Sequence, residues 1–325
     1  MKIYIYPSLF NNDLAWHDLD RLFILIEDRR YEWLIKNEND LTDFVNSTYL
    51  DAQPEYKYNI YRELAESTFS KANTEGGNHK ETVIEIQTLD NLSYNLLFLN
   101  QPLYIILENI ENDKYFLDAL FRCFKKPSKK IIRHIEFKWI EFLHAGGKDG
   151  VIPNIRGRQG RIRTRIFILL DSDKKLPNEP YSGSLTRILE FCASTHAICH
   201  TTYKREIENY LPDTVLSTLT NADQRSVYDA YAQLSSEQKD FYDLEKGFND
   251  RGTAVGQEPL FEGVRDFQNL RKGFALNKRF DTKKDFPRLF NNETYVTQEA
   301  LNTRCAHQPN PNELRDLLDT ISRLI

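Results

Sequence analysis

The feature that most constrains the fold is residues 164–170, Thr-Arg-Ile-Phe-Ile-Leu-Leu, which form an almost wholly apolar run followed by Asp-Ser-Asp. A strand that is apolar on both faces is buried on both faces, which is typical of a parallel sheet covered by helices. Shorter apolar runs at 102–107 and 196–201 alternate with helical patterns beginning near residue 112 and at 183–192. The alternation predicts an α/β fold, with a parallel sheet and helices on both of its faces.

The rest of the sheet and the domain limits follow from the same patterns. We expect a further strand at 130–135, extended or continued around 137–143, which ends at the turn Ala145-Gly146-Gly147-Lys148. The patterns predict a mixed α/β region at residues 1–100, the domain that contains the sheet at 101–212, and a mainly helical region at 213–325.

Several classes of protein are excluded by the sequence. The apolar runs are far shorter than the roughly 20 residues of a membrane helix. The N-terminus alternates like a strand and lacks a signal-peptide core, so no membrane partner is expected. The four cysteines are widely spaced and contain no C-x-x-C pair, which argues against a structural zinc site or a disulfide framework and favours a reducing, cytoplasmic environment.

The formal net charge of −5 is unevenly distributed. Residues 1–100 hold 9 Lys or Arg against 17 Asp or Glu, whereas residues 101–170 hold 14 against 7. A dense part of this basic block is an arginine strip, which consists of Arg156, Arg158, Arg161, Arg163 and Arg165. A local basic strip on an acidic protein suggests a path for a polyanion such as nucleic acid, while a solvated loop without a ligand is the other interpretation.

Carboxylates and a glycine-rich turn follow the predicted strands. Glu108 ends the first strand, Gly146-Gly147-Lys148 follows the second, and Asp171 and Asp173 follow the third. Ligands bind outside the carboxyl ends of parallel strands, so these side chains are expected to converge. Converging carboxylates repel one another unless a hard cation such as Mg²⁺ is bound. The pattern therefore suggests metal-assisted phosphoryl transfer with one or two cations.

Each motif taken alone is compatible with more than one class of protein. An Asp-x-Asp after an apolar strand also fits a phosphatase of the haloacid-dehalogenase type, a glycosyltransferase or a helix cap, and Glu108 alone fits a surface acid in a salt bridge. Glu108 upstream of the pair argues against the phosphatase. The order of the motifs along the chain, ending in Lys204-Arg205-Glu206-Ile207-Glu208-Asn209-Tyr210, is more specific than any one of them.

This ordered set resembles a Toprim domain, and within that family it is most similar to the nucleases of the overcoming-lysogenization-defect (OLD) type found in bacterial antiphage systems. The resemblance covers about residues 101–212. It implies a Rossmann-like Toprim sheet in which Glu108, Asp171 and Asp173 bind Mg²⁺ or Mn²⁺. The family often has Glu-Gly with an Asp four residues after the Glu, whereas this chain has Asn109 and Asn112 at those positions.

The resemblance also implies roles for neighbouring residues. Asp113 or Glu111 would replace the missing acid as a ligand of a second metal, and Glu206 or Glu208 would complete a metal site. Lys148 and Lys204 become candidates for binding phosphate or stabilising the charge of the transition state. The arginine strip would then lie near the active face and contact the nucleic-acid backbone.

The function implied by the resemblance is a metal-dependent endonuclease acting on DNA or RNA as the effector of an antiphage defence system. The chain has no G-x-x-x-x-G-K-[ST] motif, so an ATPase or another defence-system subunit would be a separate partner. The departures at Asn109 and Asn112 leave an alternative open. In that alternative, the chain is a non-catalytic Toprim-fold subunit that binds nucleic acid or scaffolds such a complex.

Overall fold

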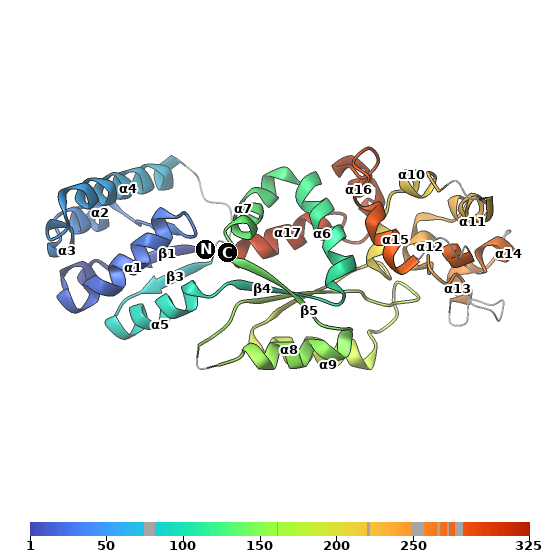
Figure 1. Cartoon of the computed structure of the whole chain (residues 1–325), viewed down its shortest axis with the longest axis horizontal. Helices are drawn as coiled ribbons and strands as arrows, with labels where there is room; N and C mark the ends of the chain where they lie inside the picture. The colour runs from blue at the N-terminus through green and yellow to red at the C-terminus, as the bar shows by residue number, and fades with distance from the viewer. Residues whose placement is uncertain are drawn as a thin grey trace. The chain divides into compact units, whose positions relative to one another are not determined.

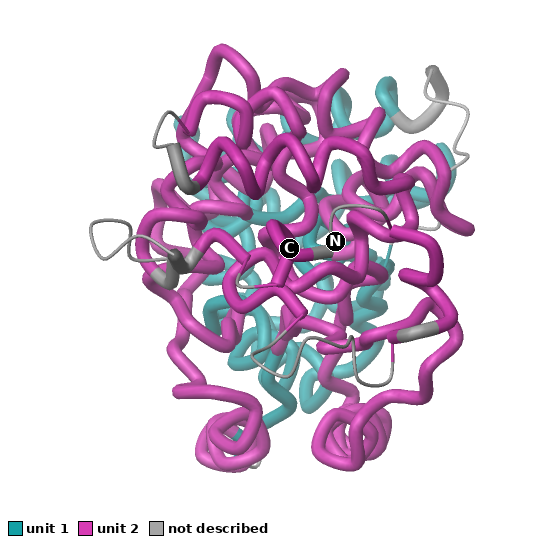
Figure 2. The backbone as a smooth tube through the Cα atoms, turned by 90° about the vertical axis from the view of Figure 1, so that its right-hand side faces the viewer, with its two compact units in different colours: residues 1–103, 159–165, 321–325 teal, residues 104–158, 166–320 magenta. Residues whose placement is uncertain are grey.

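The computed structural model describes residues 1–74, 82–160, 162–219, 222–248, 257–264, 267–271, 273–276 and 282–325. They form two compact units, shown in teal and magenta in Figure 2. Unit 1 contains residues 1–103, 159–165 and 321–325, and unit 2 contains residues 104–158 and 166–320. The first boundary lies close to the one expected at residue 100. Residues 213–320 are not a separate unit, because they belong to the same unit as the second sheet.

Unit 1 is built on a three-stranded sheet of order β2-β1-β3, in which β1 (Lys2–Ile5) pairs in parallel with β2 (Glu32–Leu34) and β3 (Val83–Ile86). Its α-helices are α1 (Trp16–Glu27), α2 (Glu38–Val45), α3 (Thr48–Asp51), α4 (Glu55–Thr74) and α5 (Leu89–Asn100). Aromatic rings fill its core; Phe23 stacks on Tyr61 at 4.6 Å and meets Trp33 edge-on at 5.1 Å. The mixed α/β character expected for this region is confirmed.

Unit 2 is built on a four-stranded sheet of order β5-β4-β6-β7. The strands are β4 (Leu103–Leu107), β5 (Ile140–His144), β6 (Ile166–Leu170) and β7 (Ile198–Thr201). β6 pairs in parallel with β4 and with β7, and every residue of β6 is buried. The prediction that the apolar run at 164–170 forms a strand buried on both faces is therefore confirmed.

Helices cover both faces of this second sheet, as predicted: α6 and α7 lie on one side of it and α8 and α9 on the other (Figure 1). Their bounds are α6 (Ile110–Cys123), α7 (Lys125–Glu136), α8 (Val151–Arg158) and α9 (Gly183–Thr195). The remaining helices are α10 (Asp213–Leu216), α11 (Ala222–Ala232), α12 (Ser236–Phe241), α13 (Glu258–Phe261), α14 (Phe267–Leu270), α15 (Thr282–Leu289), α16 (Gln298–Cys305) and α17 (Glu313–Arg323). Short 3-10 turns include η3 (Lys148–Gly150) and η4 (Ile207–Tyr210).

The strand expected at 130–135 is wrong, because these residues belong to α7, and the strand of this region is β5. Neighbouring isoleucines favoured the strand interpretation. The helix forms because Ser128, Ile131 and His134 recur every three residues and are all buried, whereas charged side chains occupy most of the other positions. Pro127 is tolerated since it lies in the first turn, where no intrahelical N–H is needed.

The C-terminal helix packs into the core. Leu314, Leu317, Leu318 and Ile321 are buried on one face of α17. Across the described residues, no helix combines the length and the apolar character needed to span a membrane.

Candidate active site

Asp171 immediately follows β6, and its position is fixed by the main chain of a distant segment. Its Oδ1 accepts a hydrogen bond of 2.8 Å from the N–H of Ile207, at the start of η4. Burial raises the pKa of Asp171 well above its ordinary value, and the negative charges of Glu208, Asp113, Glu206 and Glu108 raise it further. The end of the central strand is therefore surrounded by carboxylates.

Glu108 follows β4, the strand beside β6. Its Oε2 is buried and has no hydrogen-bond partner among the described residues. Burial raises the pKa of Glu108, the ammonium group of Lys148 lowers it, and the charge of Asp173 raises it. A buried carboxylate oxygen without a donor is unfavourable in the absence of a cation or a proton.

The Gly146-Gly147 turn brings Lys148 to this carboxylate. Ala145 donates its N–H to Leu107 O over 2.9 Å, and Gly147 donates to Glu108 O over 3.2 Å, so the turn is bound to the end of β4. Both glycines have positive φ values, 72° and 95°, which side chains disfavour. The predicted turn is thus a feature that positions Lys148, whose side chain is only 10% exposed.

The departures from the family pattern at the start of α6 have a local explanation. Asn109 is the N-cap of α6, and its side chain accepts a hydrogen bond from the N–H of Glu111. Asp113 is buried, and its Oδ2 accepts the N–H of Asn109 over 2.9 Å. Glu111 is exposed. Of the two acids considered as replacements, Asp113 is therefore the one that lies near Asp171 and Glu108.

The segment before and within η4 supplies two more carboxylates. Burial raises the pKa of Glu206 to about 8, with a further contribution from the charge of Asp243, and burial raises the pKa of Glu208 to about 7. Asn209 caps the turn, because its side chain accepts the N–H of Glu206 over 3.0 Å. Its Nδ2 donates to Lys239 O and Tyr242 O, which fixes the segment against α12.

We call Glu108, Asp113, Asp171, Glu206 and Glu208 the acidic cluster. Burial raises the pKa of Asp113 to about 7, and the charges of Glu208 and Glu108 contribute. Among the described residues, no three His, Cys, Asp or Glu side chains are arranged as a ready-made metal-binding group. The donor chemistry nevertheless fits a hard divalent cation, because the donors are all carboxylates and Glu108 Oε2 has no hydrogen-bond partner in the described part of the chain.

Asp173 lies beside this cluster rather than in it. It has a left-handed backbone conformation, with φ 52°, and its N–H donates to Arg205 O over 2.9 Å. Its carboxylate forms an ion pair with Lys148 and its side chain is 55% exposed. Lys148 thus pairs with Asp173 and also lowers the pKa of Glu108, while the charge of Asp173 raises the pKa of both Glu108 and Glu206.

The environment of Lys204 corrects its predicted role. Its side chain is fully buried, forms an ion pair with Asp240, and donates to Arg304 O over 2.9 Å. Arg304 and His307 also contact Asp240, at 3.1 Å and 2.8 Å. Burial lowers the pKa of Lys204 to about 8. Because the ammonium group is enclosed by protein, Lys204 acts as a structural ion-pair partner and does not bind phosphate.

The arginine strip does not lie beside the strand ends as expected. α8 starts after the Gly146-Gly147 turn and leads back to the start of β6, so Arg156 and Arg158 lie near the opposite edge of the sheet. They cover the rings of Phe191 and Tyr104, each at 5.1 Å.

The arginines that precede β6 differ in exposure. Arg165 is buried and donates to Gln101 O and, over 3.1 Å, to Leu324 O, so it is not available to nucleic acid. Arg163 is exposed. Arg161 lies outside the described residues.

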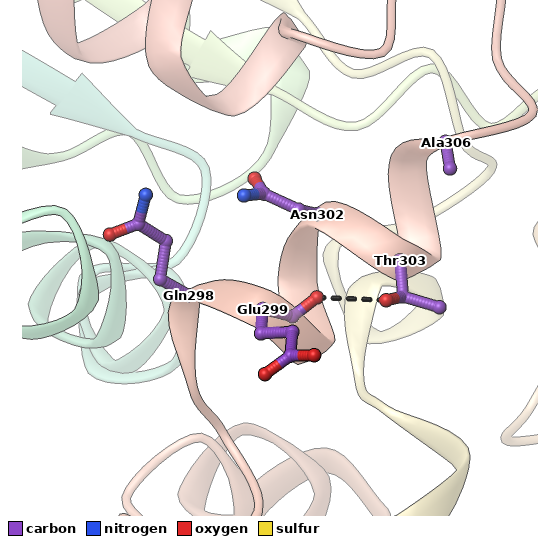
Figure 3. Close-up of a pocket in the computed structure, with 5 residues that line it drawn as sticks. All are labelled: Gln298, Glu299, Asn302, Thr303 and Ala306. Carbon is purple, nitrogen blue, oxygen red and sulfur yellow. Dashed lines mark hydrogen bonds between the residues drawn. The ribbon is translucent and has the colours of Figure 1, made fainter.

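Two surface pockets of about 490 Å³ each lie elsewhere in unit 2. One lies along α16, where Thr303 hydrogen-bonds to the backbone of Glu299 (Figure 3). The other is lined by residues that include Asp213, Lys239 and Arg304. None of the predicted catalytic or metal-binding residues lines either pocket, so the acidic cluster is identified by its electrostatics and not by a cavity.

The structure changes the weight of one expected acid and adds another. Glu208 was expected as an alternative to Glu206, and after burial its charge contributes most to the raised pKa of Asp171. Asp240 was not considered at all, because it lies in the helical region and its role depends on contacts with residues 36 and 64 positions away. The Lys-Arg-Glu-x-Glu-Asn motif itself was the available signal for Glu208.

Comparison with models of known protein families, with curated proteins and with solved structures finds no match to this chain.

Proposed function

We propose that this protein is a metal-dependent nuclease that hydrolyses phosphodiester bonds at the acidic cluster. The observation that carries the proposal is the position of Asp171 at the end of β6, where its Oδ1 accepts the N–H of Ile207 and the neighbouring strand β4 is followed by Glu108, whose Oε2 has no hydrogen-bond partner among the described residues. Carboxylates that repel one another at a sheet edge and whose pKa values are raised are common at functional sites.

The residues that would hold Mg²⁺ or Mn²⁺ are Glu108 and Asp171, with Asp113, Glu206 and Glu208 around them. Bound there, the cation would supply positive charge to the phosphate oxygens and favour ionised water as a nucleophile. The carboxylates of the cluster would orient that water and accept its proton. The raised pKa values of about 7 for Asp113 and Glu208 suit groups that exchange protons near neutral pH.

Lys148 is the cation of the described chain that is best placed to stabilise negative charge on phosphate. It is held by the glycine turn beside Glu108, and its present partner is the exposed carboxylate of Asp173. Exchange of that partner for a phosphate would bring the ammonium group into the reaction without moving the backbone. Asp173 would then be free to act as an additional ligand.

The resemblance to Toprim nucleases of the OLD type supports the choice of substrate and context. It favours DNA or RNA over a small phosphomonoester, a cytoplasmic role in antiphage defence, and a separate ATPase or other subunit as partner. These parts of the proposal depend on the order of motifs between residues 101 and 212 and not on the geometry.

The test is cleavage of plasmid, linear duplex DNA, single-stranded RNA and tRNA with Mg²⁺, Mn²⁺ or chelator. We expect metal-dependent products, and a loss of at least about 100-fold in Glu108→Gln and in Asp171→Asn. Glu111→Gln is the matched control, since it removes an exposed carboxylate from the helix that follows β4, and it should keep the rate within about twofold. Full activity in the double variant Glu108→Gln/Asp171→Asn would contradict the assignment.

A second candidate function is a non-catalytic subunit that binds nucleic acid. The ion pair between Lys148 and Asp173 favours it, because one predicted ligand already has a protein cation. It predicts no Mn²⁺ binding by calorimetry and no cleavage of any substrate, whereas the nuclease proposal predicts Mn²⁺ binding that Asp171→Asn weakens.

A further inference from the structure

Helix α7 concentrates positive charge on one face. At about 100° per residue, the residues opposite the buried Ser128, Ile131 and His134 form one outward arc. This arc, which we call the α7 basic face, consists of Lys125, Lys126, Lys129, Lys130, Ile132, Arg133 and Glu136. Lys138, just after the helix, is also exposed.

The charges of this face repel one another. Lys125 and Lys129 are four residues apart, as are Lys126 and Lys130, and Lys129 and Arg133; like charges at this spacing destabilise a helix. Within the described part of the chain, Lys125, Lys126 and Lys129 are exposed and take part in no ion pair.

Four other helices hold a cation that is compensated by an acid on the same helix. On α4, α6, α11 and α17 the acid lies four residues away, in the pairs Arg62 and Glu66, Lys114 and Asp118, Arg225 and Asp229, and Arg315 and Asp319. Lys125, Lys126 and Lys129 of α7 have no acid four residues away on either side, and an external polyanion would remove their repulsion.

We infer that the α7 basic face binds the phosphate backbone of the nucleic acid on which the acidic cluster acts. The inference rests on the proposed function, because a nuclease with an acidic net charge needs a local basic surface to hold its substrate. The arginine strip cannot provide this surface with all of its residues, since Arg165 is buried.

The contact is with the backbone and not with bases. The exposed ring of Phe137 stacks on Trp139 at 4.8 Å and lies 5.3 Å from the guanidinium of Arg133, so two protein groups already contact it. The remaining exposed groups of the face are mostly lysines, which bind phosphates without regard to sequence. Binding through α7 is thus expected to be independent of sequence and strongly dependent on salt.

The experiment measures binding of a fluorescent 30-base-pair DNA and a 30-nucleotide RNA by anisotropy, in chelator, over a series of salt concentrations. The triple variant Lys125→Gln/Lys126→Gln/Lys129→Gln is compared with Arg187→Gln/Arg225→Gln/Arg315→Gln. The second variant removes three exposed cations elsewhere on unit 2, so both variants have the same net charge. Binding to vesicles with 30% phosphatidylserine is measured as well, to test whether the α7 basic face binds an anionic membrane and not nucleic acid.

We expect the α7 variant to bind at least about tenfold more weakly and its slope of log affinity against log salt to be shallower by about 2 to 3, because each lost phosphate contact lowers the slope by about 0.7 to 0.9. The control should bind within about twofold of the unmodified protein. An unchanged slope in the α7 variant, an equal loss in the control, or binding to vesicles alone would each overturn the inference.

The outcome is separate from that of the proposed function. Binding is measured without a divalent cation, and Glu108→Gln/Asp171→Asn should retain it even if cleavage is never observed. Conversely, cleavage that is lost in Glu108→Gln but unaffected in the α7 variant at every salt concentration would leave the nuclease assignment intact and exclude α7 as its substrate surface.

Discussion

Ile207 donates its backbone N–H to Oδ1 of Asp171 over 2.8 Å, which joins the end of the central strand to the segment that contains Glu206 and Glu208. Arg304 of α16 also binds this segment, since its guanidinium donates to the backbone oxygen of Asn209 over 2.6 Å. The acidic cluster is therefore assembled by residues of the C-terminal helical region as well as by the sheet. This explains why the two regions form one compact unit.

The stability of the metal-free protein should fall as the pH rises from 5 to 8.5. Burial and neighbouring acids raise the pKa of Asp113 and Glu208 to about 7 and that of Glu206 to about 8, whereas in the unfolded chain these groups titrate near about 4. The folded state binds more protons between these values, so the stabilisation is complete below about pH 4 and is lost as the pH passes about 7 to 8.

The measurement is thermal and urea unfolding in chelator at pH 5 and pH 8.5. We expect Glu208→Gln to raise the free energy of unfolding at pH 8.5 by at least about 1 kcal/mol and to have little effect at pH 5. Addition of Mg²⁺ or Mn²⁺ should raise Tm more at pH 8.5 than at pH 5. A stabilisation by Glu208→Gln that is equal at both pH values would contradict the assigned cause, and Glu111→Gln serves as the control.

Asp240 and Lys204 should be among the residues whose loss destabilises the protein most. Both side chains are fully buried, and Asp240→Asn leaves the charge of Lys204 without its carboxylate in the interior, at a cost of about 3 to 5 kcal/mol. Lys204→Met should cost less, because Asp240 still contacts Arg304 and His307, and in urea unfolding the double variant should lose less than the sum of the two. Asp229→Asn, which breaks the exposed pair with Arg225, should cost at most about 1 kcal/mol. If the losses in free energy of unfolding for Asp240→Asn and Lys204→Met were strictly additive in the double variant, the ion pair would not be the cause of the destabilisation.

Gly150 should not tolerate a side chain. A Cβ at this position would lie 1.7 Å from the carbonyl oxygen of Ala145, which belongs to the turn that positions Lys148. We expect Gly150→Ala to destabilise the protein by about 2 kcal/mol or more. Gly157→Ala is the control, because nothing lies within 4 Å of its Cβ in α8, and it should be neutral or stabilising by up to about 1 kcal/mol. Equal unfolding midpoints for the two variants would show that the turn adapts.

Arg165 should matter for folding and not for nucleic-acid binding. Its guanidinium is buried, donates to two carbonyl oxygens, and lies 5.5 Å from the rings of Tyr31 and Phe98. Arg165→Gln should cost about 2 to 3 kcal/mol in urea unfolding. The exposed Arg163→Gln should cost less than about 0.5 kcal/mol. A tenfold loss of affinity for DNA in folded Arg165→Gln would contradict this role.

The fold was largely predictable because its strongest signals are local. The apolar run of β6 and the shorter run of β4 can be buried only within a covered sheet, and the structure confirms both strands. The error at α7 has a physical reason: Ile131 and Ile132 are β-branched, but a period of three in the buried positions outweighed their strand preference. That error concealed the basic face, since lysines in a strand would alternate between two faces.

The candidate site was predictable only in part. The strand ends locate Glu108 and Asp171, because register along the sheet is set by the strands themselves. The partners of Lys204 and Asp173 lie 36 and 25 positions away in the sequence, and no local pattern specifies them. From sequence alone, a lysine in a polar motif is expected to be exposed. Lys204 is buried because it pairs with the buried carboxylate of Asp240, which the sequence does not reveal.

Unit 1 is assembled from three stretches of chain, 1–103, 159–165 and 321–325. A single cut near residue 103 would therefore release a fragment that lacks two of its own pieces, including Arg165, whose guanidinium binds the carbonyl oxygens of Gln101 and Leu324. Protease nicking at this junction should yield halves that stay together under native conditions and separate only in denaturant. Fragments produced by dividing the chain at residue 103 will not reproduce either half as it exists in the intact protein.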